Sequence, residues 1–180
     1  MKQISLILIF IFFYSSCIPL RIAPTIKDDK IMVAKKFKRK LPNQYAFIFE
    51  DPKNANEFYN YINTKFKLNH NEVEWNVPIT IDGEELYLTF YETEIPTKTI
   101  NLVPIIIDAG LESKGYNTVY EEDHFSRVGN WYLVLTVNDS NIKDCLKPNH
   151  KAREKVLKYL RNLRVEYLNT NNYVDVLFKN

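Results

Sequence analysis

The sequence contains little glycine and little cysteine. Four glycines and eight prolines among 180 residues exclude a collagen-like chain and a glycine-rich disordered one. Two cysteines are too few for a disulfide scaffold. A net charge of only +2 gives no general attraction to nucleic acid, and we expect no nucleic-acid partner. The chain has no phosphate-loop or dinucleotide-binding glycine pattern, no Gly-x-Ser-x-Gly sequence and no Cys-x-x-Cys pair. Without these motifs the sequence indicates no catalytic residue and no cofactor, and we expect neither.

Apolar and aromatic residues are abundant. Hydrophobic residues make up 46% of the chain, and it has twelve tyrosines and eleven phenylalanines. That much ring area can fill a packed core, so the sequence predicts a folded chain of ordinary domain size.

The N-terminus carries an apolar run behind a basic start. Lys2 is followed by the nearly unbroken apolar stretch 4–14. This run is shorter than the roughly 20 residues that a membrane-spanning helix needs, and it has the length of a signal-peptide core. We therefore predict a signal peptide over 1–16.

The end of this leader resembles a bacterial lipobox. The residues are Tyr14-Ser15-Ser16-Cys17, with Tyr14 where an aliphatic residue is usual. The resemblance implies cleavage before Cys17 and a fatty-acylated thioether on Cys17. The chain is similar to small lipoproteins of Bacteroidota-type bacteria, which implies the outer membrane as its location. No acidic tract follows Cys17, which favours the periplasmic face. A secreted protein or an uncleaved anchor with an incidental Cys17 remains the alternative.

Charge divides the mature chain into two parts. Residues 18–44 hold eight basic and two acidic residues, so their net charge is 8 − 2 = +6, and 45–180 sum to −5. We predict a lipidated Cys and basic tether over 17–44 and a single globular domain over 45–180. The basic cluster 35–40 has two interpretations: contact with anionic lipid headgroups, or a solvated tether or lysine-guarded strand edge. The second is the one that we favour here.

The first half of the globular part predicts a strand, a helix and a hairpin. Residues 45–50 are apolar and aromatic, as in a buried strand. Asp51 as N-cap and Pro52 in the first turn predict a helix with its apolar stripe at Ala55, Phe58, Tyr59, Ile62 and Phe66. Strands are expected over 72–82 and 85–93, joined by the turn Asp82-Gly83. In the first of them Val73, Trp75, Val77, Ile79 and Ile81 are expected to share one face.

The second half is less uniform. Residues 99–115 fit a strand by β-branched content and a helix by their end signals, and we expect a helix. A strand over 131–138, a long helix over 149–168 and a last strand over 173–178 follow. The fold class is therefore α+β, with a mainly antiparallel sheet. The order is compatible with a ferredoxin-like βαββαβ arrangement plus a long C-terminal helix. Pro78 places its strand at a sheet edge.

One segment concentrates groups with chemical potential. Glu122, Asp123 and His124 together could ligate a divalent metal, or His124 could serve as a base for Ser126. Adjacent residues seldom converge on one ion, so a solvated loop is the interpretation that we favour. The other histidines, His70 and His150, have no partner at metal-ligand spacing.

Three tyrosines raise the possibility of a binding surface. Tyr87, Tyr91 and Tyr132 fall opposite Leu88 and Leu133 on their strands. They form an aromatic platform for a partner or a glycan if that face is open, and core if it is covered, and core is the expectation. Cys145, the remaining thiol, is expected to be buried.

The sequence leaves three functions open. The one we favour is a lipid-anchored, non-catalytic envelope module that binds another envelope component. The alternatives are an envelope hydrolase that uses His124 with nearby acids, and an immunity- or inhibitor-type protein.

Overall fold

A computed structural model describes residues 17–21, 23–96, 98–101, 129–170 and 173. The described residues belong to two compact units, which divide the chain at about residues 24, 95 and 129. In the first unit, β1 (Cys17–Arg21) and β6 (Lys98–Asn101) form a two-stranded antiparallel sheet in which Ile18 pairs with Ile100.

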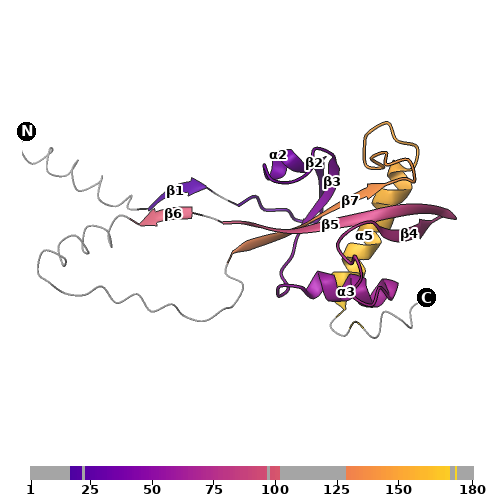
Figure 1. The fold of residues 1–180 in the computed structure, drawn as a ribbon. Coiled ribbons are helices and arrows are strands. Elements are labelled where there is room, and N and C mark those ends of the chain that lie inside the picture. Colours follow the sequence, from indigo (N-terminus) through magenta and orange to yellow (C-terminus); the bar gives the residue numbers. More distant parts are fainter. Residues whose placement is uncertain (1–16, 22, 97, 102–128, 171–172, 174–180) are drawn as a thin grey trace, which may run out of the picture. The chain divides into compact units, whose positions relative to one another are not determined.

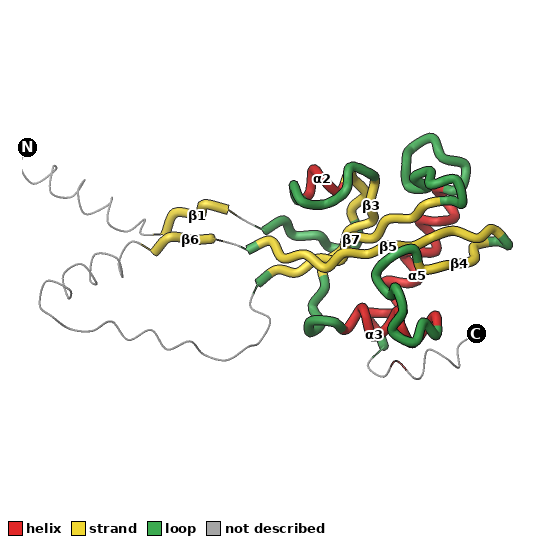
Figure 2. The backbone as a smooth tube through the Cα atoms, in the orientation of Figure 1, coloured by secondary structure: helices red, strands yellow, loops and turns green. Residues whose placement is uncertain are grey.

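The second unit contains an open antiparallel sheet of five strands in the order β2-β3-β7-β5-β4 (Figure 1). The strands are β2 (Lys30–Val33), β3 (Tyr45–Glu50), β4 (Val77–Ile81), β5 (Glu84–Ile95) and β7 (Asn130–Asn138). The helices are α2 (Ala34–Phe37), α3 (Glu57–Phe66) and α5 (Arg153–Asn169), which Figure 2 distinguishes from the strands by colour. None of the helices in the described ranges has the length and apolar character needed to cross a membrane.

The structure confirms the α+β class, and it places the strand that contains Pro78 at an edge of the sheet. The strand order differs from a ferredoxin-like arrangement. There, one strand separates the first two strands of the βαββαβ unit. Here two strands, β7 and β5, lie between β3 and β4, because β7 pairs with β3 on the side that faces β5 and occupies the centre of the sheet.

The core lies between one face of the sheet and helices α3 and α5. Alternate residues of β3, β7, β5 and β4 supply the sheet side, as period-2 geometry requires. Phe58 of α3 is fully buried, and its ring centroid lies 4.8 Å from that of Phe90 and 4.9 Å from that of Tyr167. We call the opposite face of the sheet the outer face.

The helix predicted after Asp51-Pro52 exists but begins five residues later than expected, at Glu57 and not at Pro52. Asp51 is buried and does not cap it. Its Oδ1 accepts hydrogen bonds from the Lys53 amide at 3.1 Å and from the Tyr167 hydroxyl at 2.9 Å. Asp51 therefore closes a local turn and fixes the end of α5, while Ala55 lies outside the helix and is exposed.

The hairpin is confirmed. Asp82 and Gly83 have φ angles of 51° and 76°, the left-handed conformation that a two-residue turn of this kind needs. On β5, Leu86 and Leu88 are fully buried on the core side.

The later elements are confirmed in part. Strand β7 and helix α5 match the predictions for 131–138 and 149–168, although α5 begins at Arg153. Residues 98–101 form strand β6. The helix expected within 99–115 has Asn101 as its N-cap, so its body, 102–115, lies outside the described residues. Of the predicted strand 173–178, only Tyr173 is described, as a single 3₁₀ residue.

The stretch expected to be a tether contains structure. Strand β2 pairs antiparallel with β3, with Ile31 opposite Phe47. Just before β2, the Ile26 amide donates to Glu50 Oε1 at 2.6 Å, and Arg161 of α5 pairs with Asp29 at 3.1 Å. Arg164 Nη2 lies 3.4 Å from the Lys27 carbonyl oxygen. The compact unit therefore begins at Thr25, well before Tyr45.

Candidate functional site

The outer face carries a half-exposed group of aromatic rings on β5 and the segment before β4. Tyr87 and Tyr91 alternate with the buried Leu86, Leu88 and Phe90, so they project from the outer face and are half-buried. Trp75 is 48% exposed, and its ring meets that of Tyr91 edge to face at 5.2 Å. We call Trp75, Tyr87 and Tyr91 the aromatic patch.

Trp75 reaches this face because the alternation predicted over 72–82 is interrupted at Asn76. Asn76 has a φ of 52°, and its amide donates to Thr89 Oγ1 at 3.0 Å. The Phe90 amide then bonds to the Glu74 carbonyl at 3.0 Å. Residues 71–75 form turns and bends, so the strand predicted over 72–82 exists only over 77–81, and the alternation of β4 does not set the direction of the Trp75 side chain. Val73 stays in the core, and the prediction that Trp75 shares its face is wrong.

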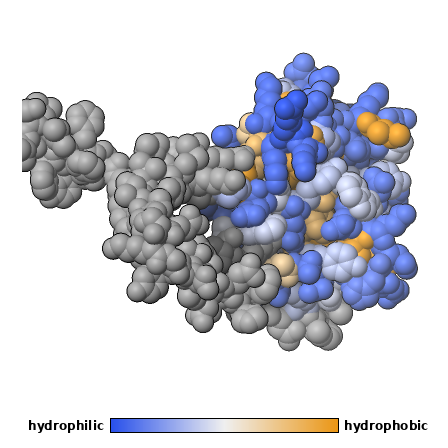
Figure 3. Space-filling view, turned by 60° about the vertical axis from the view of Figure 1, so that its left-hand side comes forward, coloured by the Kyte–Doolittle hydropathy of each residue, from blue (hydrophilic) through white to orange (hydrophobic). Residues whose placement is uncertain are grey.

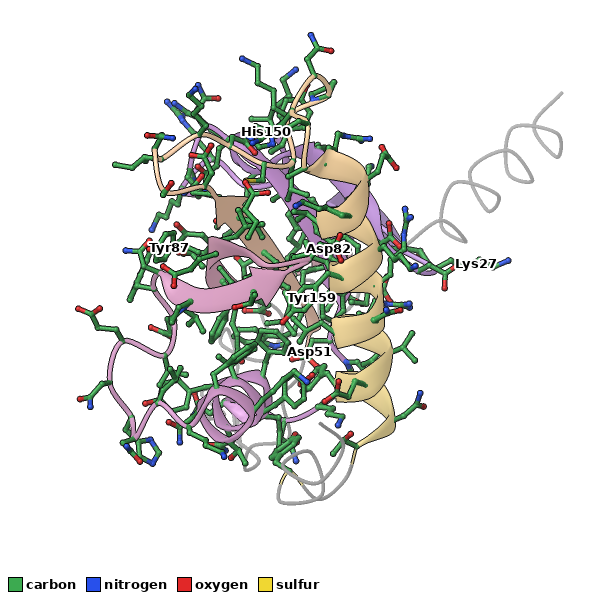
Figure 4. All side chains as sticks on the ribbon, turned by 90° about the vertical axis from the view of Figure 1, so that its right-hand side faces the viewer. Lys27, Asp51, Asp82, Tyr87, His150 and Tyr159 are labelled. Atoms are coloured by element: carbon green, nitrogen blue, oxygen red, sulfur yellow. The ribbon has the colours of Figure 1, made fainter. Side chains whose placement is uncertain are left out.

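Only two of the three predicted tyrosines belong to the patch. Tyr132 is only 1% exposed, and its ring packs against that of Phe37 of α2, with 5.1 Å between the ring centroids. Its burial raises the pKa of its hydroxyl, as burial does for Tyr91. Tyr132 is therefore core, as expected, while Tyr87 and Tyr91 remain partly open to solvent. Figure 4 shows Tyr87 on the far side of the sheet from α5.

A shallow pocket adjoins the patch at the hairpin end of the sheet. Its volume is about 430 Å³, and its lining residues are Asn76, Tyr87, Asn138, Asp139, Ser140 and Ile142. Ile142 is 84% exposed. Asn138 Oδ1 is buried and has no hydrogen-bond partner among the described residues. The pocket thus presents an amide, a hydroxyl and an aliphatic side chain beside a tyrosine ring.

The loop 139–150 that borders this pocket is organised by one carboxylate. Asp139 Oδ1 accepts the amides of Asn141 and Lys143, both at 2.9 Å. Its Oδ2 lies 3.6 Å from His150 Nε2, and His150 Nδ1 accepts the Ala152 amide at 3.2 Å. These two residues are eleven positions apart in an irregular segment, so sequence spacing gave no signal for the pair.

We expect this carboxylate to make the loop acid-sensitive. The Lys143 amide, with the Asn141 amide and His150, holds the pKa of Asp139 below its ordinary value. A lowered pKa means that folding favours the ionised form. Its stabilisation is therefore present above the unfolded pKa of about 3.9 and is lost as the pH falls through the folded value. Asp139→Asn should lower the melting temperature at pH 7 and have a shrinking effect below about pH 4. Thermal unfolding at pH 3–7 measures this, and a constant difference across that range would contradict it.

Cys145 lies within the same loop and is buried, as predicted. Burial raises the pKa of its thiol to about 12. The thiol is therefore protonated at neutral pH, which makes it a packing residue and a poor nucleophile.

The remaining predicted site residues fall elsewhere. Glu122, Asp123 and His124 lie outside the described residues, and only the backbone of Cys17 is described, in β1. Within the described ranges, no three His, Cys, Asp or Glu side chains are grouped so that they could hold a metal ion.

Comparisons with protein-family models, with curated proteins and with solved structures gave no match. The candidate site accordingly rests on its own geometry. Exposed tryptophan and tyrosine rings with amide and hydroxyl groups at their margin are the composition of a contact surface for another molecule.

Proposed function

We propose that this chain is a lipid-anchored protein of the bacterial cell envelope that acts as a non-catalytic binding module. It is attached through Cys17 to the outer membrane, with the globular unit on the periplasmic side, and it binds another envelope protein. The support for the location is the apolar run 4–14 followed by Ser15-Ser16-Cys17.

The observation that carries the binding role is the aromatic patch. Trp75 leaves about half of its surface in solvent, whereas Val73 and Val77, two positions away on either side, are buried. A half-exposed aromatic ring loses little conformational entropy when a partner binds, and it buries a large apolar area. For this reason tryptophan and tyrosine are enriched among the residues that dominate binding energy. The adjacent Asn76, Asn138 and Ser140 supply the polar margin that interfaces commonly have.

The aromatic patch is not part of a larger hydrophobic surface among the described residues. Apart from Trp75, the exposed large hydrophobic residues in the described ranges are Ile142 and Val165. In the view of Figure 3 the described surface is mainly hydrophilic, with small separate apolar areas. The small number of exposed large apolar side chains favours one localised contact over general stickiness.

We expect a photo-crosslinking residue at Trp75 to form a discrete covalent adduct in intact membranes. The reason is that Trp75 is the most open ring of the patch and would lie inside the interface. Val165 of α5 is the matched control, since it is 51% exposed against 48% for Trp75 and does not belong to the patch. Adduct formation is measured by gel shift and mass spectrometry.

The adduct partner then gives a quantitative test. Trp75→Ala should weaken its binding by about thirtyfold or more, the effect of losing a residue that dominates an interface. Val165→Ala should leave the affinity unchanged within about twofold. Equal adducts from both positions, or equal affinities of the two variants, would contradict a binding role for the patch.

A further inference from the structure

A second surface of the chain is defined by charge. Four exposed cationic side chains lie within six residues, on α2 and the turn that follows it, and we call them the basic turn. They are Lys35, Lys36, Arg39 and Lys40. No aspartate or glutamate occurs anywhere between positions 30 and 49, so the local charge is uncompensated along the chain.

The basic turn is fixed on the outer face and is no free tether. The Ala34 amide bonds to the Gln44 carbonyl at 2.9 Å, and the Lys35 amide bonds to the Pro42 carbonyl at 3.0 Å. Ala34 and Leu41 are buried beneath the turn. The fifth cation of the cluster, Lys38, is directed inward, where its ammonium donates to Thr93 Oγ1 at 2.6 Å and to the Glu94 carbonyl at 3.0 Å. Anchored in this way, the turn holds its other four cations at the surface.

Most basic residues of α5 are neutralised, which makes the contrast informative. Lys155 pairs with Glu84 at 2.6 Å, Arg161 with Asp29 at 3.1 Å and Arg153 with Glu154 at 2.8 Å. None of the four cations of the basic turn forms an ion pair with another described residue. Their charge is therefore available to an external anion, whereas the charge of α5 is largely used within the fold.

We infer that the basic turn is a docking surface for anionic phospholipid headgroups. Several lysines and arginines together near a bilayer attract acidic lipids, because each contributes separately to an attraction that acts within a Debye length. The remainder of the globular part opposes this, since residues 45–180 carry a net charge of −5. The attraction therefore orients the protein with the basic turn toward the lipid. This inference deepens the membrane attachment proposed above, on which its cellular setting rests, and it is independent of the aromatic patch.

The test uses the mature chain 17–180 with Cys17→Ser, so that no lipid is attached. Its binding to vesicles of phosphatidylcholine alone is compared with binding to vesicles that also contain phosphatidylglycerol, by flotation and surface plasmon resonance. We expect at least about tenfold tighter binding to the anionic vesicles and a clear loss in high salt. Each charge removed from a membrane-facing cluster weakens binding about fivefold, so K35Q/K36Q/R39Q/K40Q should weaken it by about two orders of magnitude or more.

A charge-matched control separates position from net charge. K143Q/K147Q/K151Q/K158Q removes the same number of charges from exposed lysines outside the basic turn, and it should retain binding within a few fold. Circular dichroism confirms that both variants are folded. Equal losses in the two variants, or wild-type binding that ignores lipid charge, overturn the inference. Retained vesicle binding in the basic-turn variant also overturns it and would leave an acidic protein surface as the occupant.

The outcome is distinct from that of the proposed function. The chain used here carries no lipid, so the result does not depend on whether Cys17 is acylated. Trp75→Ala in the same background should bind anionic vesicles like the parent chain, because the aromatic patch is not part of the basic turn.

Discussion

Replacing Phe58 with alanine is expected to lower the free energy of unfolding by about 3–5 kcal/mol, the usual cost of emptying a buried aromatic site. Phe58 is fully buried and links the sheet to both covering helices. Its ring lies within 6.3 Å, between centroids, of the rings of Phe49, Phe90, Tyr61 and Tyr167. Removal of the Phe58 ring leaves a cavity among these four rings, which are held in place by their other contacts. Urea denaturation followed by circular dichroism measures the change.

The comparison residue is Trp75, which is another aromatic side chain but is half exposed. Trp75→Ala should cost about 1–2 kcal/mol, less than Phe58→Ala, because about half of the side chain is already in solvent and its removal leaves no enclosed cavity. If the two alanine variants were equally destabilised, the assignment of the core to the α3–α5 side of the sheet would be wrong.

Changing Cys17 to serine is expected to abolish retention of the protein in membranes washed with high salt, which also releases the electrostatic contact inferred for the basic turn. A hydroxyl cannot form the thioether that the lipobox resemblance implies, and without acyl chains the stable attachment is lost. The wild-type chain should begin at Cys17 and carry the mass of a diacylglyceryl group, and the variant should carry none. Mass spectrometry of the mature N-terminus and fractionation of cells measure both quantities.

Cys145→Ser is the matched control for that experiment. It changes the other cysteine of the chain, whose thiol is buried and held protonated by its raised pKa of about 12. Lipid attachment and membrane retention should be unchanged in it. An unmodified Cys17 in the wild-type protein, or cleavage at another position, would remove the proposed anchor and the envelope location with it.

Short-range patterns predicted the regular elements well. Strand 85–93 was predicted from alternation, and Leu86, Leu88 and Phe90 are buried as that pattern requires. The turn Asp82-Gly83 was predicted because Asp-Gly readily adopts the positive φ angles of a two-residue hairpin turn. These features depend on neighbours within a few residues, which a sequence displays directly.

The predictions failed where a local pattern has two solutions. Alternation continued through Trp75, yet the left-handed Asn76 inserts an irregularity and moves that ring to the outer face. Asparagine tolerates this conformation, but nothing in the sequence requires it here. Similarly, Asp51 had the position of an N-cap, and the distant Tyr167 hydroxyl claims its carboxylate instead.

Long-range pairing set the remaining differences. Strand β2 has only four residues, and its ladder hydrogen bonds are made with β3. Its own sequence was too short to predict a strand, and it was assigned to the basic tether. The place of β7 between β3 and β5 is likewise a property of the whole sheet. The Asp139–His150 contact joins two residues of an irregular loop, where no periodicity predicts which side chains meet.

The contacts of residues 26–29 set the length of chain between Cys17 and the globular unit. The first of them, the bond from the Ile26 amide to Glu50, lies 26 − 17 = 9 residues after Cys17. Nine residues span at most about 32 Å when fully extended. If an acyl chain holds Cys17 at the lipid surface, this connecting segment keeps the globular unit within its own length of the headgroups. The unit could then bind only partners that come equally close to the membrane.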